Sequence, residues 1–265
     1  MLNVMKPIKY NPSFLTDLEL ISSFVVRKAE FDSIIETISE NTGQSNSHVL
    51  VIAPRGFGKT MLIQRVATEV RTSNELSEKW YPIVYGEESY NVTSAGEFWL
   101  ETIFHIGEQI NDDNWRKAYS ELKKEPDNKV LHDRALGRVL DFADQIDRRL
   151  LISVENLNML FNEILTDEDG WALRHTLANE PRIMLLASAT DRMNQIDNIG
   201  KALFEQFRTI KLDPLNEQEC EKVWISITGN KPKDRRMRAI EILTGGNPRL
   251  VAIVSAFGAN LSFRE

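Results

Sequence analysis

A short stretch near residue 50 combines residue types that bind phosphate. The segment His48–Gln64 (HVLVIAPRGFGKTMLIQ) places Gly56 and the triplet Gly58–Thr60 between an apolar run and an amphipathic one. In the pattern G-x-x-x-x-G-K-[ST], backbone N–H groups wrap a phosphate, the lysine reaches the terminal phosphates and the hydroxyl holds magnesium. Ala53 stands at the first glycine position, so the chain must turn there within ordinary dihedral angles while Gly56 takes up the strain. The predicted phosphate-binding residues are Pro54, Arg55, Gly56, Phe57, Gly58, Lys59, Thr60 and Met61.

Phosphate chemistry at such a loop also needs a carboxylate at the end of another core strand. This carboxylate holds magnesium through water and helps to polarise an attacking water. The candidate is Glu155, which follows the apolar run Leu151–Val154. Glu87 and Glu88 follow a second apolar run, Tyr81–Tyr85, and would lie at the same carboxyl edge of a parallel sheet. These two glutamates are either a relocated catalytic base or solvated loop residues, and both interpretations stay open.

The elements that position these residues follow from the alternation of apolar patterns. Apolar runs predict strands at 48–52, 81–85, 150–154, 183–187 and 209–212, and helical spacing recurs at 22–38, 61–70, 97–110 and 130–146. This alternation predicts an α/β fold with a parallel sheet covered by helices on both faces. Residues 1–20 look irregular, and the polar segment 111–128 is interpreted as a surface insertion. We expect an irregular N-terminal segment (1–23), an α/β core (24–213) and a small helical lid subdomain (214–265).

Composition narrows the class of protein. With 265 residues, 42% of them hydrophobic, the chain can bury one large core. The net charge of -7 argues against a surface that is basic all over, so any DNA contact would have to come from a local patch. The single cysteine, Cys220, excludes a disulfide framework and fits a reducing compartment. Because the sequence shows no signal-peptide pattern and no apolar run near the roughly 20 residues of a membrane span, we expect a cytoplasmic protein without a membrane partner.

The run Glu155–Leu160 (ENLNML) can be aligned with the pattern Asp-Glu-x-Asp-x-Leu, which follows an apolar strand. At this point the chain resembles the P-loop ATPases of the AAA+ and STAND groups, most closely the replication-initiator (origin-recognition) ATPases and related bacterial and archaeal ATPases. The resemblance implies an ASCE-type P-loop sheet with ATP and Mg²⁺ as ligands. It gives Glu155 the magnesium position, together with Thr60, and gives Asn156 the place of the catalytic glutamate.

Asn156 changes the chemistry that the resemblance implies. Asparagine can orient a water by hydrogen bonding but cannot accept its proton as a carboxylate does. A frame shifted by one residue would make Glu155 the catalytic glutamate and place Val154 at the metal position. We prefer the first frame because it also matches Leu160. In either frame one carboxylate of the usual pair is missing, and hydrolysis is expected to be slow.

Other motifs agree with the resemblance. The segment Phe24–Glu30 (FVVRKAE) resembles the motif whose backbone borders the adenine, which implies that Val26 and Arg27 contact the base. Interpreted without the family, Arg27 and Glu30 form an i,i+3 surface pair at a helix start.

Two segments of the core resemble regions that act on the γ-phosphate. Ser188 and Thr190 occupy the place of sensor 1, although either could simply cap the following loop. Phe204–Arg208 resembles the region that carries an arginine finger acting on a neighbouring subunit. Arg208 is therefore either such a finger or a salt-bridge partner.

The tail segment Thr244–Arg249 (TGGNPR) resembles the Gly-Asn-Pro signature that starts a lid helix in these ATPases. Asn247 suits the N-cap and Pro248 the first helical position, so Arg249 is held where it can reach back to phosphate. The other interpretation is an ordinary capped helix with a surface arginine. An upstream pair, Asn216 and Glu219, predicts a capping box at the start of the lid.

These features together predict an ATP-binding switch that responds to ATP and ADP and assembles with itself or with a partner protein. The first interpretation is a hydrolysing AAA+-type motor or loader that acts on DNA. The second is a nucleotide-gated scaffold or sensor of the STAND type, in defence or regulation, with little hydrolysis. The only candidate DNA patch is a basic run that is more often a solvated face, Lys231, Lys233, Arg235, Arg236 and Arg238. The sequence ends directly after the lid, and we expect target recognition to come from a further domain or a partner.

Overall fold

The computed structural model describes residues 11–41, 47–85, 92–192, 198, 200–203, 205–232 and 236–258. Glu87 and Glu88 lie outside these described residues, as do Phe204, Lys233 and Arg235. The chain divides into two compact units. The loop-lid unit comprises the described residues of Met1–Asp32, Ala53–Arg65 and Leu212–Glu265, and the sheet unit those of Ser33–Ile52 and Val66–Lys211. The sequence-based division at residues 23 and 213 stays a prediction.

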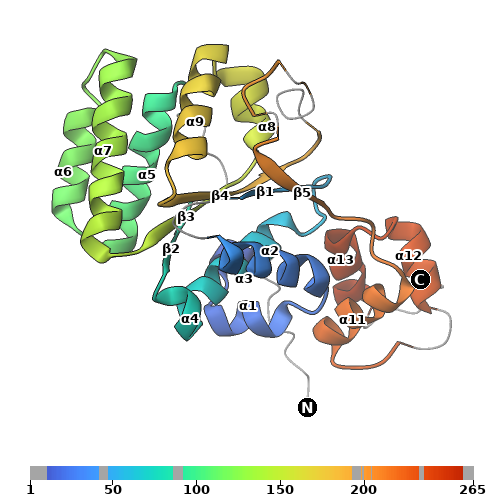
Figure 1. Cartoon of the computed structure of the whole chain (residues 1–265). Helices are drawn as coiled ribbons and strands as arrows, with labels where there is room; N and C mark the ends of the chain where they lie inside the picture. Colours follow the sequence, from blue (N-terminus) through green and yellow to red (C-terminus); the bar gives the residue numbers. More distant parts are fainter. Residues whose placement is uncertain are drawn as a thin grey trace. The chain divides into compact units, whose positions relative to one another are not determined.

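The sheet unit contains five parallel strands in the order β2-β3-β4-β1-β5 (Figure 1). The strands are β1 His48–Ile52, β2 Trp80–Val84, β3 Arg149–Val154, β4 Ile183–Ala189 and β5 Phe207–Lys211. β4 separates β1, which leads into the predicted phosphate-binding loop, from β3, which leads to Glu155. This is the ASCE-type arrangement, and the predicted α/β fold is confirmed. Because all pairs are parallel, the carboxyl ends of the strands share one edge.

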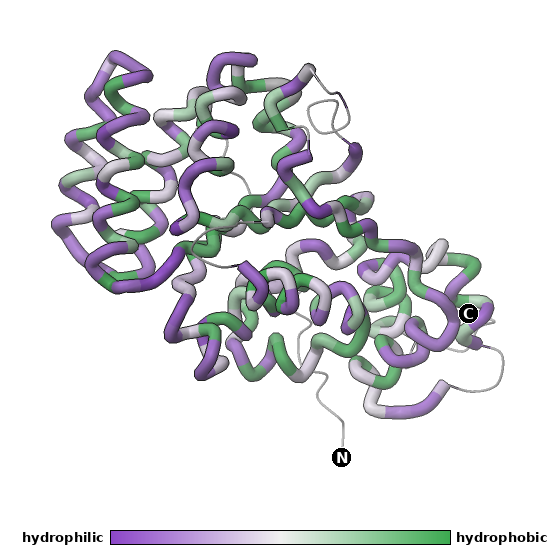
Figure 2. Tube along the Cα trace, in the orientation of Figure 1, coloured by the Kyte–Doolittle hydropathy of each residue, from purple (hydrophilic) through white to green (hydrophobic). Residues whose placement is uncertain are grey.

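Helices cover both faces of this sheet within the sheet unit (Figure 1). One face carries α5, α7, α8 and α9, and the other carries residues 33–40 of α2 and 66–72 of α3. Every residue of β1 and β4 is buried, and these two strands are largely apolar (Figure 2). Strands covered on both faces require such continuous apolar sequences. The helices of this part are α2 Lys28–Glu40, α3 Lys59–Thr72, α4 Asn74–Ser77, α5 Ala95–Ile110, α6 Asp113–Leu122, α7 Asn128–Ile146, α8 Leu157–Met159, the π-helical turn η2 Leu160–Ile164 and α9 Asp167–Asn179.

The polar segment 111–128, interpreted from sequence as a surface insertion, contains the helix α6. Its side chains Trp115 and Leu122 are buried and lie seven residues apart, on one helical face. The side chain of Asp112 caps the helix by accepting the N–H of Asn114 at 2.8 Å. An average polarity over the segment hides two apolar side chains and a cap, so the sequence-based interpretation did not identify this helix; most of its other residues are exposed, as expected of a surface insertion.

The loop-lid unit begins with a short 3-10 turn, η1 Pro12–Phe14, and the helix α1 Asp17–Ser23. The expectation that residues 1–20 are irregular was therefore wrong for this stretch. Thr16 and Glu19 form a capping box in which each side chain accepts the backbone N–H of the other. This reciprocal cap satisfies two N–H groups that a short helix otherwise leaves to water.

The rest of the loop-lid unit is helical, as predicted. Its helices are α11 Glu217–Thr228, α12 Arg236–Thr244 and α13 Pro248–Gly258. The predicted capping box of α11 is confirmed, because Asn216 and Glu219 exchange two hydrogen bonds of 3.0 Å. Their shared core contains Leu215, Cys220, Val223, Trp224, Met237, Ile240 and Val251. Among the described residues, no helix combines the length and the apolar composition needed to cross a membrane.

His48, the first residue of β1, is buried and bonded to two backbone groups. The N–H of Leu185 donates to its Nδ1 at 3.0 Å, and its Nε2 lies 3.1 Å from the carbonyl oxygen of Leu177. A backbone N–H can only donate, so Nδ1 carries no proton and Nε2–H donates to Leu177. Burial lowers the pKa of His48 from 6.5 to about 4 and keeps the ring neutral.

We expect His48 to make folding stability sensitive to acid. The unfolded chain binds this proton more tightly than the folded one, so the stabilisation is complete above pH 6.5 and is lost as the pH falls towards 4. This pKa difference corresponds to roughly 3 kcal/mol. Urea unfolding of the parent and of His48→Gln, from about pH 7.5 to about pH 4.5, should show most of that extra loss in the parent alone. Parallel pH profiles would contradict the assignment, since the carboxylates titrate in both proteins.

Candidate functional site

The predicted phosphate-binding loop, residues 53–58, joins β1 to α3. Gly56 and Gly58 adopt positive φ angles of 84° and 91°, whereas Ala53 is not among the described residues with positive φ. The expectation that Ala53 turns within ordinary dihedral angles while Gly56 takes up the strain is confirmed. The two glycines therefore supply the left-handed backbone that a tight loop requires.

Lys59 and Thr60 are the first two residues of α3. Lys59 is buried, and its Nζ donates to the carbonyl oxygens of Ala53 at 2.6 Å and Pro54 at 3.2 Å. The ammonium charge is thus held inside the loop, next to the N-terminus of a 14-residue helix. The N–H groups and the dipole of a helix N-terminus favour an anion at this place. The local geometry fits a bound phosphate.

The start of α13 is bonded to this loop within the loop-lid unit. Nδ2 of Asn247 donates to the carbonyl oxygen of Arg55 at 3.2 Å, and the N–H of Arg249 donates to that of Gly56 at 3.1 Å. Oδ1 of Asn247 accepts the N–H groups of Arg249 and Leu250. Asn247 is therefore the N-cap that the sequence predicts, and it also contacts the loop, which the sequence did not predict. The side chain of Arg249 is exposed and forms no hydrogen bond or ion pair with the described part of the chain.

The turn before α13 packs tightly against the start of the lid. Gly245 and Gly246 have positive φ angles of 58° and 66°. A Cβ atom at Gly246 would overlap the backbone oxygen of Leu215 and lie 2.8 Å from its nitrogen, whereas one at Gly245 would meet nothing within 4 Å. The N–H of Leu215 also donates to the carbonyl oxygen of Gly246 at 2.8 Å. Only Gly246 is thus constrained by both conformation and space.

Alanine substitutions at these two glycines should separate strain from overlap. Gly245→Ala should lower the free energy of unfolding by about 1 kcal/mol, because only the left-handed conformation of the alanine adds strain. Gly246→Ala adds the displacement of the Leu215 backbone and should lower the free energy of unfolding by roughly 3 kcal/mol. Urea unfolding followed by circular dichroism measures both. Equal losses in the two variants would show that the contact with Leu215 is not tight.

Arg27 is buried rather than part of a surface pair. Its Nη1 lies 3.3 Å from Oε1 of Glu30, and its Nη2 donates to the carbonyl oxygen of Asp213. Its φ of 69° is unusual for a non-glycine residue. The neighbouring Val25 and Val26 pack against the lid core. The segment predicted to border the adenine is thereby attached to the lid. The predicted i,i+3 pair of Arg27 and Glu30 is present, but Arg27 is buried and does not lie at the surface.

The residues that follow β3 belong to the sheet unit. Glu155 and Asn156 are half-buried at the carboxyl end of the strand. Asn156 has a left-handed backbone with a φ of 53°, a conformation that asparagine and aspartate tolerate better than most residues. Two residues on, Asn158 pairs with Thr190: Nδ2 donates to the threonine Oγ1 at 3.0 Å, and Oδ1 accepts its N–H at 3.1 Å. Asn158 falls on the second aspartate of the pattern Asp-Glu-x-Asp, which is the signal that could have identified it.

The two sensor 1 candidates differ in accessibility. Ser188 lies inside β4 and is fully buried, and its hydroxyl has no hydrogen-bond partner within the described ranges. Thr190 follows the strand, is half-buried, and keeps its hydroxyl proton available because Asn158 donates to its oxygen. Of the two, Thr190 is the side chain that can meet a ligand at the sheet edge.

Arg208 lies near the amino end of β5, the sheet edge opposite to Glu155. Its Nη1 donates to Oγ1 of the buried Thr37 on α2 at 2.8 Å. This contact within the sheet unit gives the arginine an internal partner. Its predicted role on a neighbouring subunit stays a prediction.

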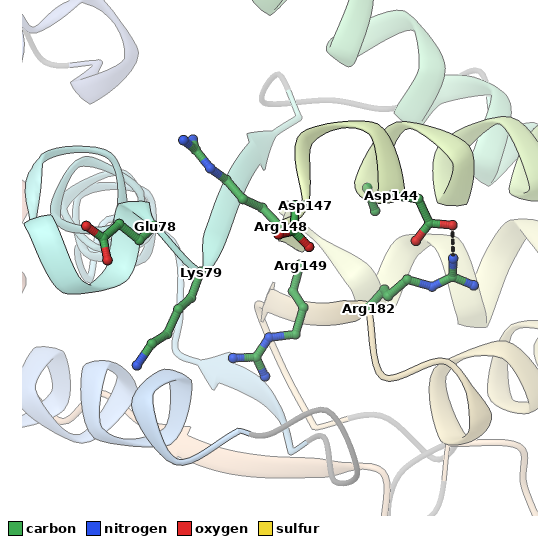
Figure 3. Close-up of a pocket in the computed structure, with 8 residues that line it drawn as sticks. Glu78, Lys79, Asp144, Asp147, Arg148, Arg149 and Arg182 are labelled. Atoms are coloured by element: carbon green, nitrogen blue, oxygen red, sulfur yellow. Dashed lines mark hydrogen bonds and ion pairs between the residues drawn. The ribbon is translucent and has the colours of Figure 1, made fainter.

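A charged hollow of about 300 Å³ also lies at this amino edge (Figure 3). Arg182 pairs there with Asp144 at 2.7 Å and with Glu180 at 2.7 Å, and Arg149 stacks on the ring of Trp80. Several of its charges are thus matched internally. The hollow is separate from the carboxyl edge that holds Glu155, and its lining residues are Glu78, Lys79, Ala143, Asp144, Asp147, Arg148, Arg149 and Arg182.

Solved structures share this fold. The ORC2 protein of Aeropyrum pernix, in ADPNP-ADP complexes, is 15% identical with a TM-score of 0.62, over 89% of this chain and 65% of that one. The ORC1 protein of Aeropyrum pernix, in complex with DNA, is 14% identical with a TM-score of 0.60, over 90% and 60%. A Walker-type ATPase of Pyrococcus abyssi is 12% identical with a TM-score of 0.57, over 91% and 69%.

No family model and no curated protein sequence matches the chain. The chain shares the P-loop fold of these ORC proteins, and the predicted resemblance to them is confirmed at the level of the fold. It covers 65% of the length of the first of these proteins and 60% of the second.

Proposed function

We propose that this chain is an ATP-binding AAA+-type switch that couples its nucleotide state to its lid and assembles with itself or a partner. The observation that carries this proposal is the bonding of the lid helix to the phosphate-binding loop through Asn247 and Arg249. A ligand that orders the loop then acts on the lid. The fold shared with the ORC proteins supports the same assignment.

The main predicted residues have the following roles in this proposal. Lys59 and the backbone N–H groups of residues 55–60 bind the phosphates, and Arg249 reaches the terminal one. Thr60 and Glu155 hold Mg²⁺, which favours oxygen ligands and keeps several waters, so a hydroxyl and one carboxylate suit it. Bound Mg²⁺ would neutralise charge on the phosphates. Val26 and Arg27 border the adenine.

Hydrolysis is proposed to be slow. Asn156 and Thr190 can orient a water, but neither accepts its proton at neutral pH. This favours the second candidate, a nucleotide-gated scaffold or sensor, over a hydrolysing motor. A motor would need Glu87 or Glu88 as its base. Steady-state turnover of the parent, Glu155→Gln, Glu87→Gln and Glu88→Gln decides between them, because loss of fast turnover at residue 87 or 88 would identify a relocated base.

DNA is not favoured as a ligand of the lid. Three residues of the basic run lie in the described part of the chain; Lys231 is exposed, and the other two are engaged within the lid. Arg236 lies over the ring of Trp224, and Arg238 pairs with Glu241 at 2.7 Å. A filter-binding assay at low and high salt tests this point, since phosphate contacts weaken steeply with salt.

The test of the switch uses the purified chain. Calorimetry with MgATP and MgADP should show binding of both, and mass photometry should show a larger assembly with one nucleotide than with the other. Absence of binding to either nucleotide would overturn the proposal. Binding without any change in assembly would leave a nucleotide-binding domain and remove the switch.

A further inference from the structure

The amide of Asn247 is held at both ends. Its oxygen accepts the N–H groups of Arg249 at 3.0 Å and Leu250 at 3.2 Å, and its nitrogen donates to the carbonyl oxygen of Arg55. This network fixes the orientation of the amide, because the oxygen must face the N–H donors. The side chain therefore joins the first turn of α13 to one defined peptide group of the phosphate-binding loop.

Holding that carbonyl also orients the N–H group on the other side of the same peptide. The described residues contain no cis peptide, and in a trans peptide the C=O and N–H bonds point in opposite directions. The Arg55 carbonyl points towards Asn247, so the N–H of Gly56 points away from it. In the same way, the N–H of Arg249 donates to the carbonyl oxygen of Gly56 and holds the next peptide. The N–H of that peptide, which belongs to Phe57, also donates to the carbonyl oxygen of Pro54 over a long distance of 3.4 Å.

We infer that Asn247 is a positioning residue for phosphate binding, which it supports by holding the Arg55 carbonyl so that the N–H of Gly56 faces the phosphate. This inference rests on the proposed function. It assigns to the asparagine a role that is separate from capping α13 and separate from the guanidinium of Arg249.

The close fit at Gly56 supports this assignment independently. A Cβ atom at Gly56 would lie 2.8 Å and 2.9 Å from the two amide atoms of Asn247 and 3.3 Å from Cβ of Arg249. The amide thus occupies the space that any other residue would fill. A side chain at position 56 would have to displace the Asn247 amide and would adopt a φ of 84° that residues other than glycine rarely take.

The arrangement couples the two sites in both directions. A hydrogen bond to the carbonyl of a peptide polarises it and strengthens donation by its N–H. Phosphate bound at the Gly56 N–H therefore strengthens the bond from Asn247, and by linkage an attached lid strengthens phosphate binding. The lid responds to phosphate through the loop backbone as well as through Arg249.

The test compares Asn247→Asp with Asn216→Asp. Aspartate keeps the capping acceptor at both positions, but at 247 it removes the donor to Arg55 and places a carboxylate against a carbonyl. Asn216 caps α11 and forms no hydrogen bond with the described residues of the loop, so it is the matched control. We expect Asn247→Asp to weaken MgATP and MgADP binding about tenfold, and Asn216→Asp to change it less than about twofold.

Asn247→Ser is a second test of the same contact in case the aspartate variant misfolds. Serine is also a good N-cap but is too short to reach Arg55. It should show the same loss of affinity, with an unchanged circular dichroism spectrum. In hydrogen exchange, MgATP should protect α13 in the parent and protect it less in both variants of Asn247. A parent that binds no nucleotide overturns the proposed function and this inference together. A parent that binds nucleotide while the Asn247 variants bind equally well overturns the inference alone.

Discussion

Replacing Lys59 by alanine should weaken MgATP binding by about 100-fold or more. The ammonium group lies inside the predicted phosphate-binding loop, where it donates to the carbonyl oxygens of Ala53 and Pro54. In the proposed complex it also donates to the terminal phosphates. A hydrogen bond to a charged group contributes about 1.5–3 kcal/mol. Losing two such bonds to the phosphates therefore corresponds to a loss of about 100-fold or more in affinity.

Two measurements make this result interpretable. Lys117→Ala removes an exposed lysine of α6 and should leave nucleotide affinity unchanged. Thermal unfolding of Lys59→Ala shows whether loss of the loop contacts destabilises the fold. If a folded Lys59→Ala variant bound MgATP as tightly as the parent, residues 53–60 would not be the phosphate-binding loop.

Placing a carboxylate at position 156 should raise ATP turnover by about 100-fold. Asn156 follows β3 directly, at the position that the resemblance gives to the catalytic glutamate. A positioned general base contributes roughly 10²–10⁴-fold to rate, and asparagine cannot supply it. Asn156→Asp keeps the size of the side chain, and aspartate tolerates the observed φ of 53°. Asn156→Glu provides a longer reach at a cost of about 1 kcal/mol in backbone strain.

The control for this experiment is Asn158→Asp, which adds the same charge two residues away. That side chain pairs with Thr190, so it should not produce a new catalytic base. Turnover that rises only in the position 156 variants would confirm the frame in which Glu155 holds magnesium. Unchanged turnover in Asn156→Asp and Asn156→Glu would contradict that frame. Equal stimulation by Asn158→Asp would mean that added negative charge, not position, is responsible.

The main elements could be predicted because their signals are local. Short apolar runs identified the strands, since a parallel strand covered on both faces needs an uninterrupted apolar sequence. The capping box at Asn216 and Glu219 and the glycines of the loop follow from conformational rules that act within a few residues. The same local signals were overlooked in α1 and α6, where a cap and one or two buried side chains define a helix inside a polar segment.

The sequence by itself determined the order of the strands along the chain, the glycine turn between β1 and α3, and the N-cap of α13. Only the tertiary structure decided that Asn247 bonds to Arg55, 192 residues away, that Arg27 is buried against Asp213, and that Asn158 holds Thr190. Periodicity and turn chemistry report contacts within one or two turns of a helix or strand. Hydrogen bonds between distant segments depend on how the chain packs, and no local pattern encodes the partner.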